Sequence, residues 1–297
     1  MKLDDWLNIG VPLIAKSLET LHKEHFSITN TLGFSGTEKI IRILKDFRFV
    51  LFPCLCDEVD VDEARINVAI SNKLRIASLD LRDLIATVYR IEQPTSADDF
   101  KDKASDIVMN LVNALPEIRS LLQTDIIAAY NGDPATTSTE EILLSYPSIK
   151  AVMIHRIAHE LYKADVPVIP RVMSEYGHQL TGIDIHPGAS IGEYFFIDHG
   201  TGVVIGETCT IGKNVKIYQG VTLGAKNFPL DENGNPIKGI KRHPDIEDNV
   251  VIYAGATILG GKTKIGHDST VGGNIWLTQS VPPHSRVYSS TPSPNIE

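Results

Sequence analysis

The spacing of hydrophobic residues changes near residue 182 and divides the 297-residue chain into two parts. Before that point apolar residues recur with a period near 3.6, as in amphipathic helices. After it, aliphatic residues recur every six positions, which neither a helix nor an alternating strand produces. The change predicts a helical N-terminal domain over residues 1–181, followed by a domain of another class.

The helical pattern is clearest in four segments, which place their apolar residues on one stripe: 38–52, 63–91, 105–115 and 147–162. Proline favours the start or the break of a helix, and four prolines fall beside these segments: Pro94, Pro116, Pro134 and Pro147. We therefore expect a helical bundle whose connections lie near the four prolines.

The six-residue spacing is carried by sixteen aliphatic residues in four runs: Ile185, Ile191, Ile197, Val203; Ile205, Ile211, Ile217, Leu223; Ile240, Ile246, Ile252, Ile258; Leu259, Ile265, Val271, Leu277. Three hexapeptides close one triangular coil, and each aliphatic side chain then stacks inside on its counterpart in the next coil, about 4.7–4.9 Å away. The pattern predicts a left-handed parallel β-helix, a hexapeptide-repeat solenoid, over residues 182–282.

Two segments depart from the repeat. Residues 224–239 contain Pro, Asp, Asn and Gly, which favour a loop, and a loop that leaves a regular solenoid is often functional. The tail after Pro282, residues 283–297, is rich in Pro and Ser, and we expect little order there.

The charge excludes some partners. The formal net charge is -9, which argues against a nucleic-acid partner. No stretch has the roughly 18 apolar residues of a membrane span, and the N-terminus lacks the pattern of a secretory signal, so we expect a cytoplasmic protein without a membrane partner.

Three cysteines, Cys54, Cys56 and Cys209, have neither redox nor zinc spacing, and we interpret them as incidental thiols.

Polar residues interrupt the repeat at a few places: Asp184-Ile185-His186-Pro187, Asp198-His199-Gly200-Thr201-Gly202, and Arg242-His243-Pro244 just after the loop. A full coil has about 18 residues, so Asp184 and His199 lie close to one turn apart. A carboxylate next to an imidazole can fix its tautomer and support a general base.

These motifs, together with Tyr218-Gln219-Gly220-Val221-Thr222-Leu223-Gly224-Ala225, resemble the serine O-acetyltransferase family of cysteine biosynthesis. In the helical part, Asp133-Pro134-Ala135 resembles the family's Asp-Pro-Ala segment, and His155-Arg156-Ile157-Ala158-His159 its Arg-Ile-Gly-His helix. The resemblance covers residues 120–285 well and the first 120 only in general character.

The resemblance implies a transfer of acetyl from acetyl-CoA to the L-serine hydroxyl, by direct attack and without a covalent enzyme intermediate. His199 is then the general base and Asp184 orients it. Asp133 and Asp198 bind the serine amino group. Arg242 binds the serine carboxylate, with His243 beside the substrate. A zwitterion needs opposite charges at its two ends, and a hydroxyl needs a base to become a nucleophile, so these roles are chemically consistent.

For acetyl-CoA, the resemblance implies contacts at six small residues: Gly224, Ala225, Ala254, Gly255, Gly272 and Gly273. Lys216, Lys226, Lys241, Lys262 and Lys264 are candidates for the CoA phosphates. No metal and no permanently bound cofactor is implied. Family members are usually dimers of trimers, with sites between subunits, so a homo-oligomer is expected. Many relatives end in an Ile that docks into O-acetylserine sulfhydrylase; here Glu297 follows Ile296, which argues against that partner.

Three alternatives remain open. The first is a hexapeptide acyltransferase with another acceptor, such as homoserine, a sugar or an antibiotic; the zwitterion-binding set argues against a sugar. The second is a zinc β-helix of the γ-carbonic-anhydrase kind, for which His186, His199, His243 and His267 supply the residue type. The third is a structural module, which leaves His199 and Arg242 unexplained.

Overall fold

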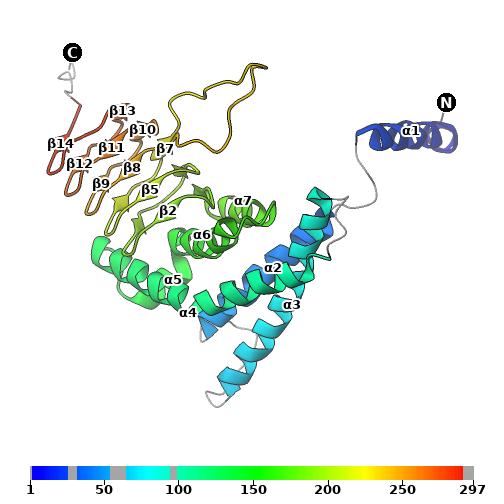
Figure 1. Ribbon diagram of the computed structural model, residues 1–297, viewed down its shortest axis with the longest axis horizontal. Helices are drawn as coiled ribbons and strands as arrows, with labels where there is room; N and C mark the ends of the chain where they lie inside the picture. The colour runs from blue at the N-terminus through cyan, green and yellow to red at the C-terminus, as the bar shows by residue number, and fades with distance from the viewer. Residues whose placement is uncertain (1, 26–31, 54–64, 94–98, 290–297) are drawn as a thin grey trace.

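The computed structural model describes residues 2–25, 32–53, 65–93 and 99–289, and within these ranges the helices precede the strands (Figure 1). The predicted fold class, a helical part followed by a left-handed parallel β-helix, is confirmed. Several residues named above lie outside the described ranges: Cys54, Cys56, Pro94, Ile296 and Glu297.

The described helices are α1 (Leu3–His25), α2 (Gly33–Leu51), α3 (Ile66–Glu92), α4 (Lys101–Gly132), α5 (Thr139–Ser145), α6 (Pro147–Lys163) and α7 (Ile169–Thr181). Helix α2 packs on α3 and α3 on α4, while α6 packs on both α4 and α7. The apolar stripes predicted from the sequence form this core, as the full burial of Ile40, Leu81 and Ile126 shows.

Helix α4 is longer than the pattern predicted, because it runs through Pro116. A proline inside a helix removes one backbone hydrogen bond and costs about 3 kcal/mol or more. Leu115 and Ile118, on either side of it, are both buried, and their burial offsets that cost. The prediction that Pro116 interrupts the helix was wrong, whereas Pro147 does stand in the first turn of α6.

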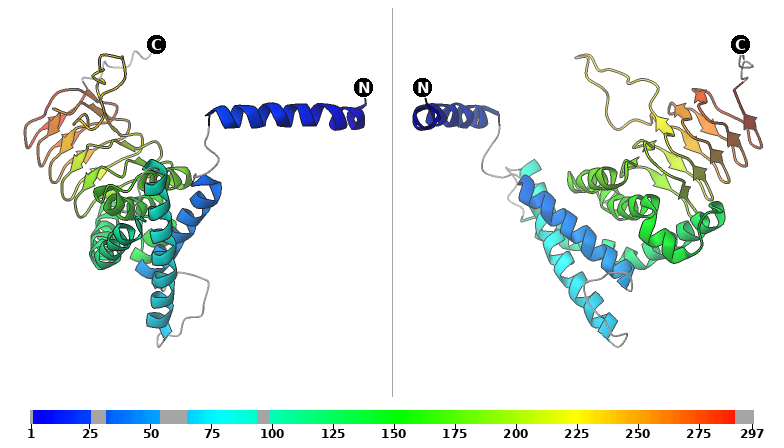
Figure 2. Two further views of the ribbon diagram at one scale, coloured as in Figure 1. Left: turned by 45° about the vertical axis from the view of Figure 1, so that its right-hand side comes forward. Right: turned by 180° about the vertical axis from the view of Figure 1, so that it is seen from behind.

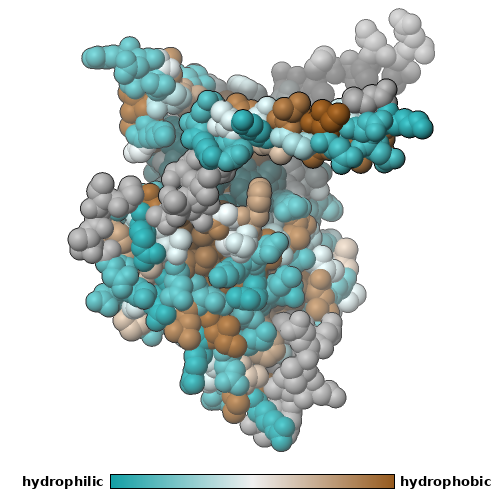
Figure 3. Space-filling model, turned by 90° about the vertical axis from the view of Figure 1, so that its right-hand side faces the viewer, coloured by the Kyte–Doolittle hydropathy of each residue, from teal (hydrophilic) through white to brown (hydrophobic). Residues whose placement is uncertain are grey.

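Helix α1 projects away from the other helices (Figures 1 and 2). Its hydrophobic side chains are exposed: Leu3, Trp6, Leu7, Ile9, Val11, Leu13, Ile14, Leu18 and Leu21. Figure 3 shows a brown, hydrophobic patch on the helix that crosses the upper part of the view. An apolar surface of this extent is typical of a segment that packs against another protein surface.

The β-helix consists of three parallel sheets, one on each face of a triangular coil. Sheet A contains β1 (Asp184–Ile185), β4 (Val204–Ile205), β7 (Thr222–Gly224), β10 (Thr257–Leu259) and β13 (Trp276–Leu277). Sheet B contains β2 (Ser190–Ile191), β5 (Thr210–Ile211), β8 (Asp245–Ile246) and β11 (Lys264–Ile265). Sheet C contains β3 (Phe196–Ile197), β6 (Lys216–Ile217), β9 (Val251–Ile252), β12 (Thr270–Val271) and β14 (Arg286–Val287).

The stacked interior positions are mostly those predicted from the six-residue spacing. In sheet C, Ile197 pairs with Ile217, Ile217 with Ile252, and Ile252 with Val271. Three predicted positions do not belong to these columns: Val203, Ile240 and Leu259. Ile205, Ile246 and Ile258, which were also predicted, do pair in the sheets, and the frame shifts because some corners hold extra residues.

The three corners of the coil are named here by one residue each. The His199 corner joins sheet C to sheet A and includes Asp198–Gly202. The Arg242 corner joins sheet A to sheet B and includes Gly206–Thr208 and Arg242–His243. The His284 corner joins sheet B to sheet C and includes Asn249, Asp268 and His284. Residues between β7 and β8 form the loop at the Arg242 corner, seen projecting from the solenoid in Figure 1.

The solenoid extends beyond the boundary expected at residue 282, because Arg286–Val287 form β14 and pair with β12. The last coil therefore includes part of the segment expected to lack order. Among the described residues, no helix is both long and apolar enough to cross a membrane.

The motif His155–His159 attaches the helices to the first coil. Arg156 is buried and forms a two-pronged ion pair with Asp125 of α4, with both N–O distances 2.9 Å. The same guanidinium donates hydrogen bonds to the carbonyls of Ile191 and Gly192, at 3.2 and 2.9 Å. This contact fixes where the end of α4 lies against the coil, and Asp133 follows directly after that end.

Candidate active site

The His199 corner places an imidazole in solvent next to a largely buried carboxylate. The side chain of His199 is 69% exposed, and its Nε2 lies 3.7 Å from Oδ1 of Asp198, which is only 11% exposed. The turn requires a positive φ of 59° at His199 and 89° at Gly200. A Cβ at Gly200 would lie 2.5 Å from Cδ1 of Ile183, so only glycine fits there.

The end of α4 adds Asp133 to the same corner. The Tyr146 hydroxyl donates to Oδ2 of Asp133 at 2.5 Å, and the Ala135 backbone N–H donates to Oδ1 at 2.8 Å. These two hydrogen bonds, with the charges of Lys216 and His199 nearby, hold the pKa of Asp133 below its usual value. The carboxylate is therefore a fixed anion that accepts further donors at neutral pH.

Lys216 completes this cluster, and its place there was not expected from the sequence. Its Nζ lies 3.3 Å from Oδ2 of Asp198 and donates to the carbonyl of Gly132 at 2.7 Å. It also lies over the rings of Phe196 and Tyr218, 5.0 and 4.6 Å from their centroids. Because its ammonium is held by these groups, Lys216 is not free to bind a CoA phosphate.

Asp184 opens the first strand of sheet A and pairs with Val204, one coil above. It therefore lies near the edge that carries His199. Neither a hydrogen bond nor an ion pair joins the two residues, both of which belong to the described part of the chain. The predicted acid–imidazole pair is thus brought to one edge of the coil without direct contact.

The Arg242 corner holds a second polar group. Arg242 is paired with Glu207 through Nη2 and Oε2, and the Tyr162 hydroxyl of α6 donates to the other carboxylate oxygen at 2.6 Å. Burial alone raises the pKa of Glu207, but the hydrogen bonds from Tyr162 and Arg242 lower it on balance. Loop residues including Phe228 and Ile237 line a cavity of about 360 Å³ beside Arg242.

His243 is buried at this corner, and its tautomer follows from its partners. The backbone N–H of Thr208 donates to Nδ1 at 3.1 Å, so the proton of the neutral ring is on Nε2. Burial, helped by the charge of Arg242, lowers the pKa of His243 to about 4. The ring packs against Gly206, where a Cβ would lie 2.0 Å from Cδ2 of His243. At neutral pH His243 is a hydrogen-bond donor through Nε2 and not a base.

The residues predicted to bind acetyl-CoA also fall on two corners. Ala254, Gly255, Gly272 and Gly273 lie at the His199 corner in later coils, where the backbone of Gly255 bonds to Gln219 and that of Asn274 to Ala254. Gly224 and Ala225 lie at the Arg242 corner, where the chain leaves β7 for the loop. The column of small residues above His199 leaves the backbone open on that edge.

The two corners are separated by sheet A. One face of the coil holds about six residues, and at roughly 3.3 Å per residue it is on the order of 20 Å wide. The cluster of Asp133, Asp198 and His199 and the cluster of Arg242 and His243 therefore lie too far apart in one chain to hold the same small amino acid.

The four histidines of the zinc alternative do not converge. His199 and His243 lie at different corners, and His267 lies at the third. Within the described residues, the one group of three or more potential ligands is His267, Asp268 and His284. Within one chain, these four histidines therefore form no zinc site of the carbonic-anhydrase kind.

Known proteins resemble the chain over most of its length. A plasmid-encoded serine acetyltransferase of Synechococcus elongatus is 49% identical over 251 residues, which span 82% of this chain and 78% of the relative. The crystal structure of serine acetyltransferase isoform 3 from Entamoeba histolytica, in complex with cysteine, has a TM-score of 0.72 and 38% identity, covering 86% of this chain and 83% of that one.

A Neisseria gonorrhoeae serine acetyltransferase in complex with serine is more distant, with 27% identity and a TM-score of 0.55 over 86% of this chain and 96% of its own. No protein-family model matches the chain. The β-helix and these relatives place the protein among the hexapeptide-repeat acyltransferases. More narrowly, the chain belongs to the serine acetyltransferase family, which confirms the predicted family and class of enzyme.

Proposed function

We propose that this chain transfers the acetyl group of acetyl-CoA to the hydroxyl of L-serine and releases O-acetylserine and CoA. The observation that carries the proposal is the His199 corner, where an exposed imidazole lies with two carboxylates, Asp198 and Asp133. This arrangement offers a base for the hydroxyl and two anions for the neighbouring ammonium group. The names of the relatives support serine as the acceptor.

His199 acts as the general base. Its imidazole takes the proton of the serine hydroxyl while the oxygen attacks the thioester carbonyl. The imidazolium then returns this proton to the sulfur, and CoA leaves as the thiol. Serine itself is the nucleophile, so no acyl-enzyme is needed. Asp184 orients the imidazole: both residues lie on one edge of the coil, and catalytic hydrogen bonds often tighten only when substrate is bound.

Asp133 and Asp198 bind the ammonium group of serine. Both carboxylates are held by other groups, Asp133 by Tyr146 and Asp198 by Lys216, so they are already positioned before serine arrives. Lys216 supplies one positive charge between them, which lowers the repulsion of two carboxylates at short range. Its role is to position the carboxylates, and it does not touch the substrate in this proposal.

Arg242 and His243 bind the carboxylate of serine. A guanidinium donates two parallel hydrogen bonds to a carboxylate, and the neutral imidazole of His243 adds a third donor through Nε2. Without substrate, Glu207 is paired with the guanidinium of Arg242. Because Tyr162 donates a hydrogen bond to Glu207, the two residues together hold Arg242 at the corner. The substrate carboxylate binds the donors of Arg242 that Glu207 leaves available.

Two copies of the chain form each site. The ammonium and carboxylate groups of serine are only a few ångströms apart, whereas the clusters that bind them are separated by a face on the order of 20 Å wide. The His199 corner of one copy must therefore meet the Arg242 corner of another. A closed ring of copies related by rotation makes this contact for every chain, and the trimer that the family resemblance implies is such a ring.

Acetyl-CoA binds in the groove between the same two copies, with Ala254, Gly255, Gly272 and Gly273 from one and Gly224 and Ala225 from the other. The helical domain, residues 1–181, is proposed to join two such trimers through its exposed apolar surface on α1.

The first test measures CoA release from acetyl-CoA with L-serine, with L-homoserine and without acceptor. Release that depends on serine supports the proposal, and release only with homoserine moves the protein to another acceptor. Replacing Arg242 by Ala is expected to raise the KM for serine more than the KM for acetyl-CoA. If only acetyl-CoA binding weakens, Arg242 belongs to the CoA site.

A further inference from the structure

The His284 corner carries a column of side chains that the proposed reaction does not use. From the second coil onward, successive coils place there a polar residue with a left-handed backbone: Asn214, Asn249, Asp268 and His284, with φ between 54° and 58°. The Asn214 amide donates to Asn249 at 2.9 Å, and the Asn249 amide donates to Oδ1 of Asp268 at 3.0 Å. The column thus begins with amides and ends with a carboxylate and an imidazole.

A second histidine joins the end of this column. Nδ1 of His267 lies 2.7 Å from Oδ2 of Asp268, and Nδ1 of His284 lies 3.8 Å from the same oxygen. One potential ligand atom from each of the three residues lies within 4.8 Å of the others. The two imidazole rings are nearly perpendicular, at 87°, with centroids 4.9 Å apart.

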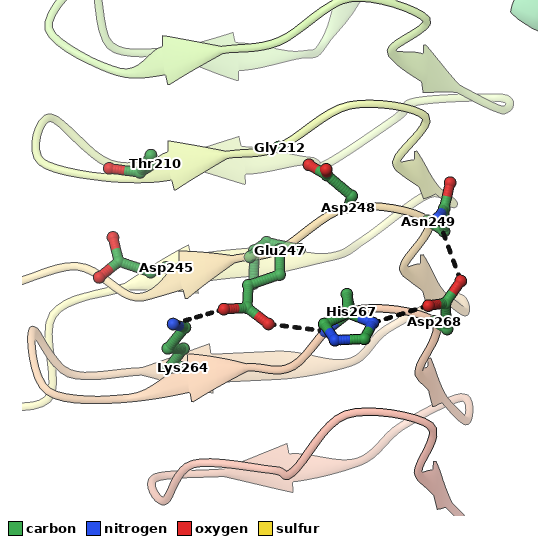
Figure 4. A pocket seen from close by; sticks show the side chains of 10 residues that line it. Thr210, Gly212, Asp245, Glu247, Asp248, Asn249, Lys264, His267 and Asp268 are labelled. Atoms are coloured by element: carbon green, nitrogen blue, oxygen red, sulfur yellow. Dashed lines mark hydrogen bonds and ion pairs between the residues drawn. The ribbon is translucent and has the colours of Figure 1, made fainter.

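The cluster is held in place by its neighbours. Figure 4 shows Asn249 bonded to Asp268, Asp268 to His267, and the backbone N–H of His267 to Glu247, which is paired in turn with Lys264. These contacts fix Asp268 and the main chain of His267, while the side chain of His284 is 71% exposed and free to turn. The cluster opens on a depression of about 640 Å³ over sheet B.

We propose that His267, Asp268 and His284 bind one divalent transition-metal ion of the zinc class. Bonds of about 2.0–2.1 Å in tetrahedral geometry place ligand atoms about 3.3 Å apart. The separations from Oδ2 of Asp268 to the two imidazole nitrogens, 2.7 and 3.8 Å, lie on either side of this value, and all three ligand atoms lie within 4.8 Å of one another, so rotations of the rings can bring them to one ion. Two imidazoles and one carboxylate favour zinc, nickel or copper over magnesium and calcium, which prefer oxygen ligands. Water completes the coordination.

The bound ion links the last coil to the one before it. His267 and Asp268 precede β12, whereas His284 precedes β14, which among the described strands pairs with β12 alone. A terminal coil of a solenoid has a neighbour on one side only and is the first to open. An ion held by both coils therefore slows the opening of β14, without any part in acetyl transfer.

Zinc binding is tested by titrating the metal-free, full-length protein with zinc chloride and, separately, with magnesium chloride in a calorimeter. We expect one zinc ion to bind per chain and no comparable binding of magnesium. In the variants His284→Ala and Asp268→Asn, zinc binding is expected to be lost or its affinity lowered at least tenfold. His178→Ala is the matched control, since His178 is an exposed histidine with one nearby carboxylate, Glu175. Equal zinc binding in His284→Ala and in the unsubstituted protein would overturn the proposal.

Hydrogen exchange gives a second, independent measurement. When zinc is present at 100 times its dissociation constant, exchange of the β14 amides is expected to slow about 100-fold, because opening must release the ion. The amides of β3, at the other end of the solenoid, serve as the internal reference. Zinc that binds without slowing β14 exchange would place the ion elsewhere. Both measurements are independent of the reaction, so the failure of one proposal does not decide the other.

Discussion

Mixing two inactive variants tests whether each active site is shared between copies. His199→Ala removes the base at one corner, and Arg242→Ala removes the carboxylate-binding group at the other. The two corners lie at opposite edges of sheet A, on the order of 20 Å apart, so each variant leaves the other corner intact. At a serine concentration near the KM of the unsubstituted protein, each variant alone is expected to lose most of its activity, His199→Ala through a lower kcat and Arg242→Ala through a higher KM for serine.

The expected recovery follows from counting sites. In a ring assembled at random from equal amounts of the two variants, a site is complete when one chain supplies His199 and its neighbour supplies Arg242. That combination has a probability of about one quarter, so the mixture should recover about one quarter of the unsubstituted activity per chain. Sites contained within one chain would recover nothing, since every chain carries one defect.

The assay is CoA release after co-expression of the two variants at equal levels. A chain with both substitutions, co-expressed with the unsubstituted chain, is the control: shared sites give about one quarter of the full activity, and sites within one chain give about one half. The background is the activity of the two variants when they are purified separately and mixed without exchange of subunits. Affinity tags on the two chains verify that the co-expressed variants do share rings. If the co-expressed variants are then no more active than the background, a shared site is refuted.

Four further changes test individual parts of the structure. His199→Ala should lower kcat by about 10²–10⁴, the usual contribution of a general base, and an unchanged kcat in steady-state assays would remove His199 from this role. Gly206→Ala forces a Cβ to within 2.0 Å of the His243 ring, so it should raise the KM for serine and cost about 1–3 kcal/mol of stability, measured by urea unfolding. Ile217→Ala, at a fully buried position between Ile197 and Ile252, should cost about 2–5 kcal/mol in the same measurement. Burial lowers the folded-state pKa of His243, and that of His155 well below the usual value, so their contribution to stability is complete above about pH 6.5 and is lost as pH falls toward 4. A melting temperature that stays constant between pH 6.5 and 4 would contradict the lowered pKa of both histidines.

The sequence by itself determined the class of the solenoid. Ile, Leu and Val at six-residue intervals can be buried together only if the chain turns at every hexapeptide, and stacking then follows from the strand spacing. The same pattern could not place every coil. Val203 and Ile205 both fit the period, and the choice of Ile205 depends on the extra residues of the turn at His199 and Gly200.

The motifs likewise predicted the residues that form the two clusters, but not which of them share a corner. Asp184 and His199 were expected to lie near each other because their spacing is close to one coil; they lie at one edge of the coil, and no hydrogen bond joins them. Lys216 looked like an exposed cation, because the sequence does not show that the end of α4 covers it through Gly132.

What only the tertiary structure decided is that the candidate site residues lie at two different edges of one triangular coil. In the sequence, a loop interrupts the six-residue repeat between His199 and Arg242. The spacing of the two residues therefore does not predict at which corner of the coil each of them lies. The three-sided coil puts the two residues on different corners, each with its own supporting helix residues, Asp133 on one side and Tyr162 on the other. A face on the order of 20 Å wide separates the corners, and this separation is the reason for the proposal that a second copy completes the site.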